Sequence, residues 1–155
     1  MATATKLHDK TLTVLMPVTF AWRRVQDLLI NAFEGGSNYW YCILRFDAPP
    51  GPRESWPVLV EDEARKRGDR VTNIYPHGDY PVNPGGSLVV DDSRNDERKA
   101  TRPARRLDRE RLAEALVEWA EKCPRHFANW LAENDDAETA DTFLQIAVLG
   151  EIIYG

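Results

Sequence analysis

Cysteine is scarce in this chain, and long hydrophobic runs are absent from it. The 155 residues contain only Cys42 and Cys123, which are too few for a disulfide framework and fit a reducing compartment. No apolar run approaches the ~20 residues needed to cross a bilayer. The segment Met1–Lys10 lacks the basic-then-apolar pattern of a signal peptide. We therefore expect a cytoplasmic protein with no membrane partner.

Recognised catalytic and cofactor motifs are also missing. The sequence has no metal-ligand spacing, no Walker loop, no nucleophile elbow and no dinucleotide-binding fingerprint. We therefore assign no catalytic residue, no metal and no cofactor, and we favour a non-enzymatic function.

Aromatic residues, by contrast, are plentiful, and charge is unevenly distributed. Five Trp, five Tyr and five Phe supply the apolar area for a core, and self-association stays open if some of these rings are exposed. Arg94–Arg111 holds eight basic and four acidic residues, whereas Leu112–Gly155 holds two basic and nine acidic ones. The pI of 5.2 disfavours direct nucleic-acid binding. The acidic last third leaves a protein-interaction or nucleic-acid-mimic module as an alternative function.

The order of local patterns predicts an α+β fold. We expect residues 1–155 to form a single compact domain, with a small antiparallel sheet packed by three to four helices and residues 1–9 as a candidate flexible N-terminus. β-Branched residues predict a strand over Lys10–Val18. Thr19 is the expected N-cap of a helix that ends at Gly35-Gly36 in the left-handed cap conformation.

The middle of the chain is irregular. Ser37–Phe46 has the composition of either a short helix or a strand, and Trp56–Lys66 that of a short helix or an edge segment. Prolines and glycines predict a loop over Tyr75–Gly86. Ser87–Val90 and Arg98–Arg102 are expected to pair as a hairpin.

Three helices are expected in the last third. Asp108 is a candidate N-cap for the first, and Pro124 interrupts the helical pattern and begins a second. Asp135, with Glu138 three residues later, resembles a capping box for a last helix that runs from Ala137 to about Leu149. This helix is apolar on nearly all sides, so we expect it to be buried.

A candidate ligand site follows the first helix. An acid, two glycines, two small polar residues and two rings occur in succession, which is suitable for a planar polar ligand such as a nucleobase or nucleotide. The alternative is an ordinary glycine cap followed by core aromatics. The residues concerned are Glu34, Gly35, Gly36, Ser37, Asn38, Tyr39 and Trp40.

The last helix contributes a second set of candidates. Asp141 and Gln145 are four residues apart and share one face of a helix that is otherwise apolar. A buried carboxylate needs hydrogen-bond partners, so Asp141 either completes the ligand pocket or belongs to a structural network. A small hydrolase or transferase that uses Glu34, Asp141 or His126 is the enzymatic alternative.

Three blocks of sequence resemble a family of small, uncharacterised proteins of bacteriophages and prophages. They are Ala32–Trp40, Gly85–Asp91, and Asp141–Gln145 together with Leu149–Gly155. The resemblance implies a phage or mobile-element origin, the cytoplasm of a host cell as location, and a compact α+β domain. Small accessory proteins of phages often bind a host protein or a nucleotide signal used in defence. We therefore expect an accessory protein that binds a small polar ligand or a host protein, with counter-defence as its setting.

Overall fold

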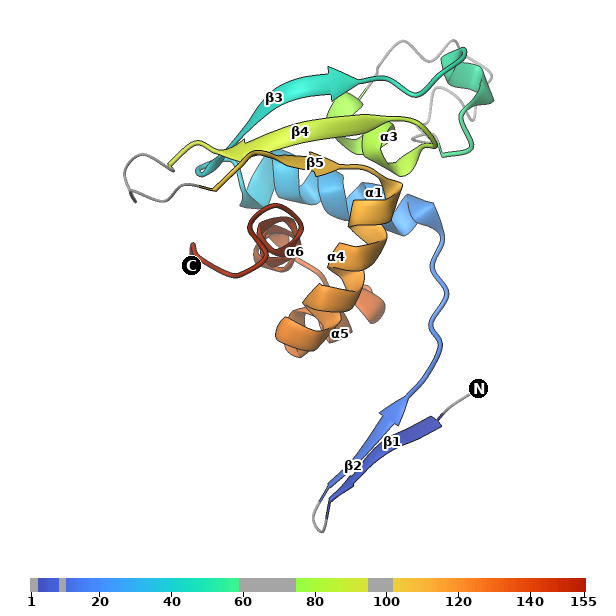
Figure 1. Cartoon of the computed structure of the whole chain (residues 1–155), viewed down its shortest axis with the longest axis vertical. Coiled ribbons are helices and arrows are strands. Elements are labelled where there is room, and N and C mark those ends of the chain that lie inside the picture. The colour runs from blue at the N-terminus through green and yellow to red at the C-terminus, as the bar shows by residue number, and fades with distance from the viewer. Residues whose placement is uncertain (1–2, 9–10, 59–74, 95–101) are drawn as a thin grey trace.

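A small antiparallel sheet lies against a group of helices in the computed structural model, which describes residues 3–8, 11–58, 75–94 and 102–155 (Figure 1). The sheet has the strand order β3-β4-β5, with β3 at Tyr41–Asp47, β4 at Ser87–Asp92 and β5 at Arg105–Leu107. Leu88 of β4 lies opposite both Phe46 and Leu107. This arrangement confirms the predicted α+β class with its small antiparallel sheet.

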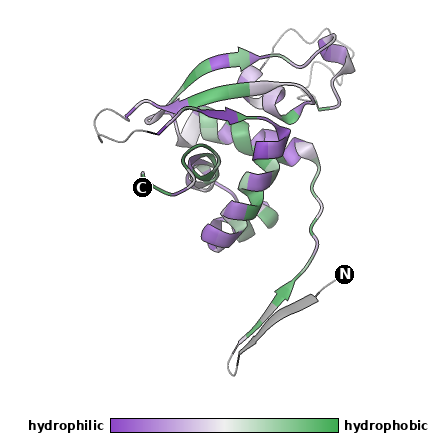
Figure 2. Ribbon diagram, in the orientation of Figure 1, coloured by the Kyte–Doolittle hydropathy of each residue, from purple (hydrophilic) through white to green (hydrophobic). Residues whose placement is uncertain are grey.

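Five α-helices and two short helical turns accompany the sheet in the part of the chain that is described. They are α1 (Trp22–Asn31), η1 (Ala32–Gly36), η2 (Arg53–Ser55), α3 (Pro76–Val82), α4 (Arg109–Lys122), α5 (Pro124–Leu131) and α6 (Ala137–Leu149). Helix α6 is the centre of the core, since its residues from Thr139 to Val148 are all buried. Its ribbon has both green and purple segments in Figure 2, because polar residues are buried in this helix beside the apolar ones.

The chain begins with a β-hairpin that lies apart from the sheet and the helices. Strands β1 (Thr3–His8) and β2 (Thr11–Leu15) pair antiparallel, and an extended segment, residues 16–21, joins them to α1 (Figure 1). The strand expected over Lys10–Val18 is confirmed as β2. Its pairing with β1 has no counterpart in the sequence analysis, and the flexibility of residues 1–9 stays a prediction.

The first helix forms as predicted, but its two ends differ from the prediction. Thr19 is not the N-cap: Ala21 takes that position without a side-chain hydrogen bond. The chain passes from α1 into the π-type turn η1, and Gly36 is not in the left-handed conformation. A Cβ atom on Gly36 would lie 2.0 Å from the carbonyl oxygen of Ala137, so glycine is required there by close contact with α6.

The middle of the chain contains more regular structure than expected. Ser37–Phe46 resolves into strand β3, which begins at Tyr41. The predicted loop over Tyr75–Gly86 is wrong, because α3 forms with Pro76 at its first turn, where proline loses no helical hydrogen bond. Strand β4 pairs with β3 on one side and with β5 on the other. Residues 98–101 of the hairpin partner expected at Arg98–Arg102 lie outside the described residues, as do residues 59–66 of the segment expected at Trp56–Lys66.

The three predicted helices of the last third are confirmed. Asp108 caps α4 by accepting a hydrogen bond from the backbone N–H of Arg111, and α5 begins at Pro124. The cap of α6 is Asp136 rather than Asp135, because the Asp136 carboxylate accepts from the backbone N–H of Thr139. A shift of one residue places this carboxylate three residues before the N–H that it binds.

Candidate functional site

The Asp141 carboxylate joins the diglycine bend to the last helix. Its Oδ1 accepts hydrogen bonds from Ser37 Oγ (2.6 Å) and Trp40 Nε1 (2.7 Å). Its Oδ2 accepts from Tyr39 Oη (2.9 Å) and Gln145 Nε2 (2.9 Å). These five residues form what we call the Asp141 network. The network brings together the two segments that the sequence analysis selected separately.

All four donors of the Asp141 network are uncharged groups, and they occupy both oxygens of a carboxylate that is 7% exposed. Hydrogen bonds to an ionised group are stronger than neutral ones, which offsets the cost of burying the charge. Burial, followed by the hydrogen bond to Asp141 and its negative charge, raises the pKa of Tyr39 to about 12. Tyr39 therefore remains a protonated donor over the physiological pH range.

Gln145 extends this network to the C-terminal tail, residues 150–155. Its Oε1 accepts from the backbone N–H groups of Ile153 (2.8 Å) and Tyr154 (2.9 Å), and its Nε2 donates to the Tyr154 carbonyl (2.9 Å). The Tyr154 hydroxyl contacts both Asp92 oxygens (2.8 and 2.9 Å), and its ring stacks on Trp40 at 5.8 Å. The tail is thus held against α6 and the edge of the Asp141 network.

A concave pocket of about 810 Å³, the tail pocket, opens beside this network. Its walls come from the diglycine bend, the junction between α4 and α5, the first turns of α6 and the C-terminal tail. The lining residues are Gly35, Gly36, Tyr39, Lys122, Cys123, Pro124, Arg125, His126, Ala137, Glu138, Asp141, Thr142, Ile152, Tyr154 and Gly155. The pocket therefore combines aromatic rings with charged side chains of both signs.

The α4–α5 junction supplies the positive charge of the tail pocket. Lys122, Arg125 and His126 lie within two residues of Pro124. The first residues of α5 line the same pocket, and its N-terminus, where the helix dipole is positive, has no side-chain cap. Lys122 Nζ donates to the Gly150 carbonyl (2.6 Å), and His126 Nδ1 lies 3.1 Å from Thr139 Oγ1. These contacts fix two of the three basic groups.

The predicted ligand residues divide into three groups. Gly35, Gly36, Tyr39 and Asp141 line the tail pocket. The side chains of Ser37, Trp40 and Gln145 are 0% exposed and direct their polar atoms into the Asp141 network. These three residues therefore lie behind the pocket wall, and a direct ligand contact for them stays a prediction.

Glu34 and Asn38, the other two predicted ligand residues, lie elsewhere. Asn38 is exposed and is not among the residues that line the tail pocket. Glu34 Oε1 is 3.1 Å from His77 Nε2, in a separate hollow of about 400 Å³. Asn38 and Glu34 are therefore placed on neighbouring surface rather than in the pocket.

The residues of the enzymatic alternative have different partners. Glu34 contacts His77, His126 contacts Thr139, and Asp141 is held by the four donors described above. Only His126 and Asp141 line the same pocket. Within residues 3–8, 11–58, 75–94 and 102–155, no group of three His, Cys, Asp or Glu is arranged to hold a metal ion.

Sequence reasoning missed two of the basic residues of the pocket, Lys122 and Arg125, and the ring of Tyr154. Lys122 and Arg125 flank Pro124, and this charged helix break was the local signal that could have drawn attention to them. Tyr154 lies in the last block of the resemblance, but its stacking on Trp40 joins residues 114 positions apart. Contacts of that separation leave no local pattern.

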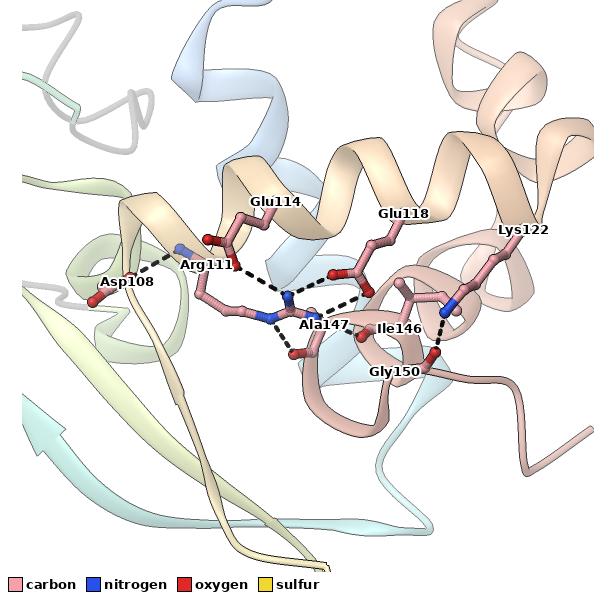
Figure 3. A network of polar contacts seen from close by, with 8 residues as sticks. All are labelled: Asp108, Arg111, Glu114, Glu118, Lys122, Ile146, Ala147 and Gly150. Atoms are coloured by element: carbon pink, nitrogen blue, oxygen red, sulfur yellow. Dashed lines mark hydrogen bonds and ion pairs between the residues drawn. The ribbon is translucent and has the colours of Figure 1, made fainter.

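A second polar network holds the opposite end of α6 (Figure 3). The guanidinium of Arg111 donates to the carbonyls of Ala147 (2.9 Å) and Ile146 (3.0 Å), which are last-turn acceptors of the helix. It also donates to Glu118 (2.8 Å) and Glu114 (3.3 Å), and the Arg111 hydrogen bond lowers the pKa of Glu118. We call this set the Arg111 network.

Comparisons with known proteins give no further guide to this site. No protein-family model, no curated protein and no solved structure matches the chain. Across the described residues, no helix combines the length and the apolar character needed to span a membrane.

Proposed function

We propose that this chain is a non-enzymatic binding protein whose tail pocket holds a small, polar, negatively charged molecule such as a nucleotide. The observation that carries the proposal is the composition of one concave surface. Two phenol rings, Tyr39 and Tyr154, share it with two cationic side chains, those of Lys122 and Arg125, and with the imidazole of His126. Rings suit a planar base, and the cations suit a phosphate.

The dimensions of the pocket support a ligand of this size. Small-molecule sites commonly measure roughly 300–1,000 Å³, and the tail pocket has about 810 Å³. Tyr39 is 45% exposed, yet its hydroxyl is held by Asp141, so the ring is presented in a fixed orientation. Pre-organisation of this kind lowers the entropic cost of binding.

The state of Asp141 supports binding rather than catalysis. A general base needs a free lone pair within reach of the proton it removes, and four donors already occupy this carboxylate. A hydrolase or transferase would have to rely on His126 and Asp141 without Glu34, which lies in the other hollow. The enzymatic alternative therefore has the weaker geometric support.

Contacts within the fold also weaken the case for an acidic mimic. Asp136 caps α6, Glu118 binds Arg111, and Asp141 is buried, so part of the acidic charge of the last third is used internally. The resemblance to phage and prophage proteins supplies the setting of the proposal. The ligand would be a nucleotide signal of host defence, and a host protein is the alternative partner.

Calorimetric titration with cyclic and linear nucleotides tests the proposal. We expect Arg125→Glu and Tyr39→Ala each to weaken binding about tenfold or more, because a charge-assisted bond or a stacked ring is worth roughly 1–3 kcal/mol. Arg45→Glu is the matched control, since Arg45 is an exposed base on β3 paired with Asp47. No heat from any nucleotide or from inorganic phosphate would overturn the proposal and favour a protein partner.

A further inference from the structure

The N-terminal arm, residues 3–8 and 11–18, carries an unusual amount of exposed apolar side chain. Leu12, Leu15 and Met16 are 59%, 59% and 69% exposed, and Val14 and Val18 are 47% and 54% exposed. Figure 2 shows green over part of β2, on an arm that projects away from the sheet and the helices. Five large apolar residues are thus presented to water on one projecting arm, three of them in β2 and two in the extended segment that follows it.

A hairpin in this position lacks the support that strands normally need. Two isolated strands are marginally stable at best in water, and they become stable when a third strand or a packed layer covers their apolar face. Pro17 lies in the extended segment between β2 and α1, where its ring fixes the backbone φ angle and it has no N–H to donate. We therefore expect the apolar side chains of the arm to pack against another protein surface.

The body of the same chain offers a matching surface on β3. This strand is at the edge of the β3-β4-β5 sheet, so one row of its backbone N–H and C=O groups has no partner strand within the described residues. Leu44 and Phe46 on β3 are 59% and 48% exposed. A bulge lies between Ile43 and Arg45, which turns Leu44 out of the regular alternation. Unpaired edges with apolar side chains readily accept an added strand.

The arm is not placed on this edge in its own chain. Figure 1 is drawn with the longest axis vertical, and β3 and the arm lie at its opposite ends. A second copy removes the difficulty, because each chain then supplies an arm and receives one. Two exchanged arms and two receiving strands also approach the roughly 20–30 residues a side of a standard stable interface. Such an exchange is closed and symmetric, so it ends at a dimer.

We propose that the N-terminal arm pairs with the β3 edge of a second copy of this chain, so that two copies exchange arms in a symmetric dimer. Leu12 and Val14 of one copy cover Leu44 and Phe46 of the other. The receiving sheet grows from three strands to five, and both the exposed hairpin and the exposed edge lose their contact with water.

Sedimentation of the full chain and of three variants tests this dimer. The arm variant is Leu12→Lys with Val14→Lys, and the edge variant is Leu44→Lys with Phe46→Lys. Thr11→Lys is the matched control, because Thr11 is an exposed polar residue of the same strand as Leu12. We expect the wild-type chain and the control to sediment as dimers at micromolar concentration, and the arm and edge variants as monomers with unchanged circular dichroism.

Mixing the two monomeric variants gives the sharper result. The arm variant keeps an intact edge and the edge variant keeps an intact arm, so the mixture is expected to form one-to-one heterodimers joined by a single arm. A monomeric wild-type chain would overturn the proposal. A wild-type dimer that survives the arm substitutions, or a mixture that stays monomeric, would overturn it as well.

Discussion

Helix α6 is held near its two ends by buried groups of opposite charge, and the two arrangements differ in kind. Near the beginning, the Asp141 anion is surrounded by neutral hydroxyl, indole and amide donors. Near the end, the Arg111 cation binds two carboxylates and the last carbonyls of the helix (Figure 3). The Asp141 network lies beside the tail pocket, whereas the Arg111 network connects α4 to the last turn of α6 through ion pairs and hydrogen bonds.

The difference shows how one helix can serve both stability and recognition. A guanidinium forms several bonds with a fixed planar geometry, which is suited to closing the carbonyl end of a helix. A carboxylate that binds neutral donors instead fixes the directions of several side chains, among them the half-exposed ring of Tyr39. We therefore expect disruption at the Asp141 end to alter the pocket, and disruption at the Arg111 end to alter stability alone.

The largest expected effect follows from Asp141→Ala. Ser37 Oγ, Trp40 Nε1 and Gln145 Nε2 are buried donors that would lose this acceptor, and each such group costs roughly 1–3 kcal/mol when left unpaired. We expect the free energy of unfolding to fall by about 3–5 kcal/mol, measured by urea denaturation. Asp141→Asn is the control of equal size and should cost less. Equal stability of the alanine variant and the wild type would contradict the account.

Arg111→Met is expected to have the next largest effect. The substitution keeps an unbranched apolar stem but removes the guanidinium donors from the Ala147 and Ile146 carbonyls, of which Ile146 keeps its hydrogen bond from the backbone N–H of Gly150. We expect a loss of about 2–3 kcal/mol, below the cost of breaking a fully buried pair, because Glu118 is 34% exposed and regains water. Ligand affinity measured by calorimetry should not change. If Arg111→Met folds normally but binds nucleotides poorly, the claim that the Arg111 end of α6 affects stability alone would be contradicted.

Gly36 and Gly150 are required for different reasons: Gly36 for its close contact with Ala137, and Gly150 for its positive φ angle. Gly36→Ala places a Cβ atom against the Ala137 backbone beside the tail pocket. We expect the free energy of unfolding to fall by about 2 kcal/mol and ligand binding to weaken. Gly150→Ala, at φ +79° with free space around it, should cost about 1 kcal/mol and leave binding unchanged. Thermal unfolding measures the stability of both variants, and calorimetry measures their ligand binding. Equal effects of the two substitutions on binding would contradict this prediction.

The smallest expected effects are responses to pH at the two ends. The lowered pKa of Glu118 means that its stabilising contribution is present above the usual value of 4.5 and is lost as the pH falls through the lowered pKa. The raised pKa of Tyr39 means that its contribution is present below 10.0 and is lost as the pH rises through about 12. Unfolding free energies measured across both ranges should therefore decline at each extreme.

Two variants test which end of α6 causes the loss of stability at acid pH and which causes the loss at alkaline pH. Arg111→Met should remove part of the acid decline, and Tyr39→Phe part of the alkaline one. Absorbance titration of the phenols gives an independent reading, since the wild-type chain minus Tyr39→Phe should show one tyrosine that ionises near 12. A difference curve centred at the ordinary value of 10.0 would show that Asp141 and burial do not act on this hydroxyl.

Local patterns in the sequence were sufficient to predict the helices of the last third. Apolar spacing, the Asp108 cap and the Pro124 break are all effects within four residues, and α6 ends where its pattern ends. The failure at α3 has the opposite origin. Its prolines and glycine indicate a loop, but Asp79 and Asn83 make buried bonds to Gln26 and Val58 that stabilise the helix from outside it.

The candidate site was only partly predictable, for the same physical reason. The sequence indicated that Asp141 needs partners and that the diglycine bend is suited to close approach, but Ser37 and Asp141 are 104 residues apart. Nothing local identifies which polar side chains become buried donors and which remain on the pocket wall. In the sequence, Arg111 is one of eight basic residues in Arg94–Arg111, and no local pattern indicates that it is the one that binds the last turn of α6.

A nuclear magnetic resonance titration of the full chain with the nucleotides used for calorimetry tests the central claim most directly. If the tail pocket is the binding surface, the backbone amide signals of Gly35, Gly36, Tyr39, Arg125 and His126 will shift together as ligand is added. The signals of Arg111 and Glu118 at the other end of α6 will stay in place. Shifts confined to other surfaces, or none at saturating ligand, would contradict the account.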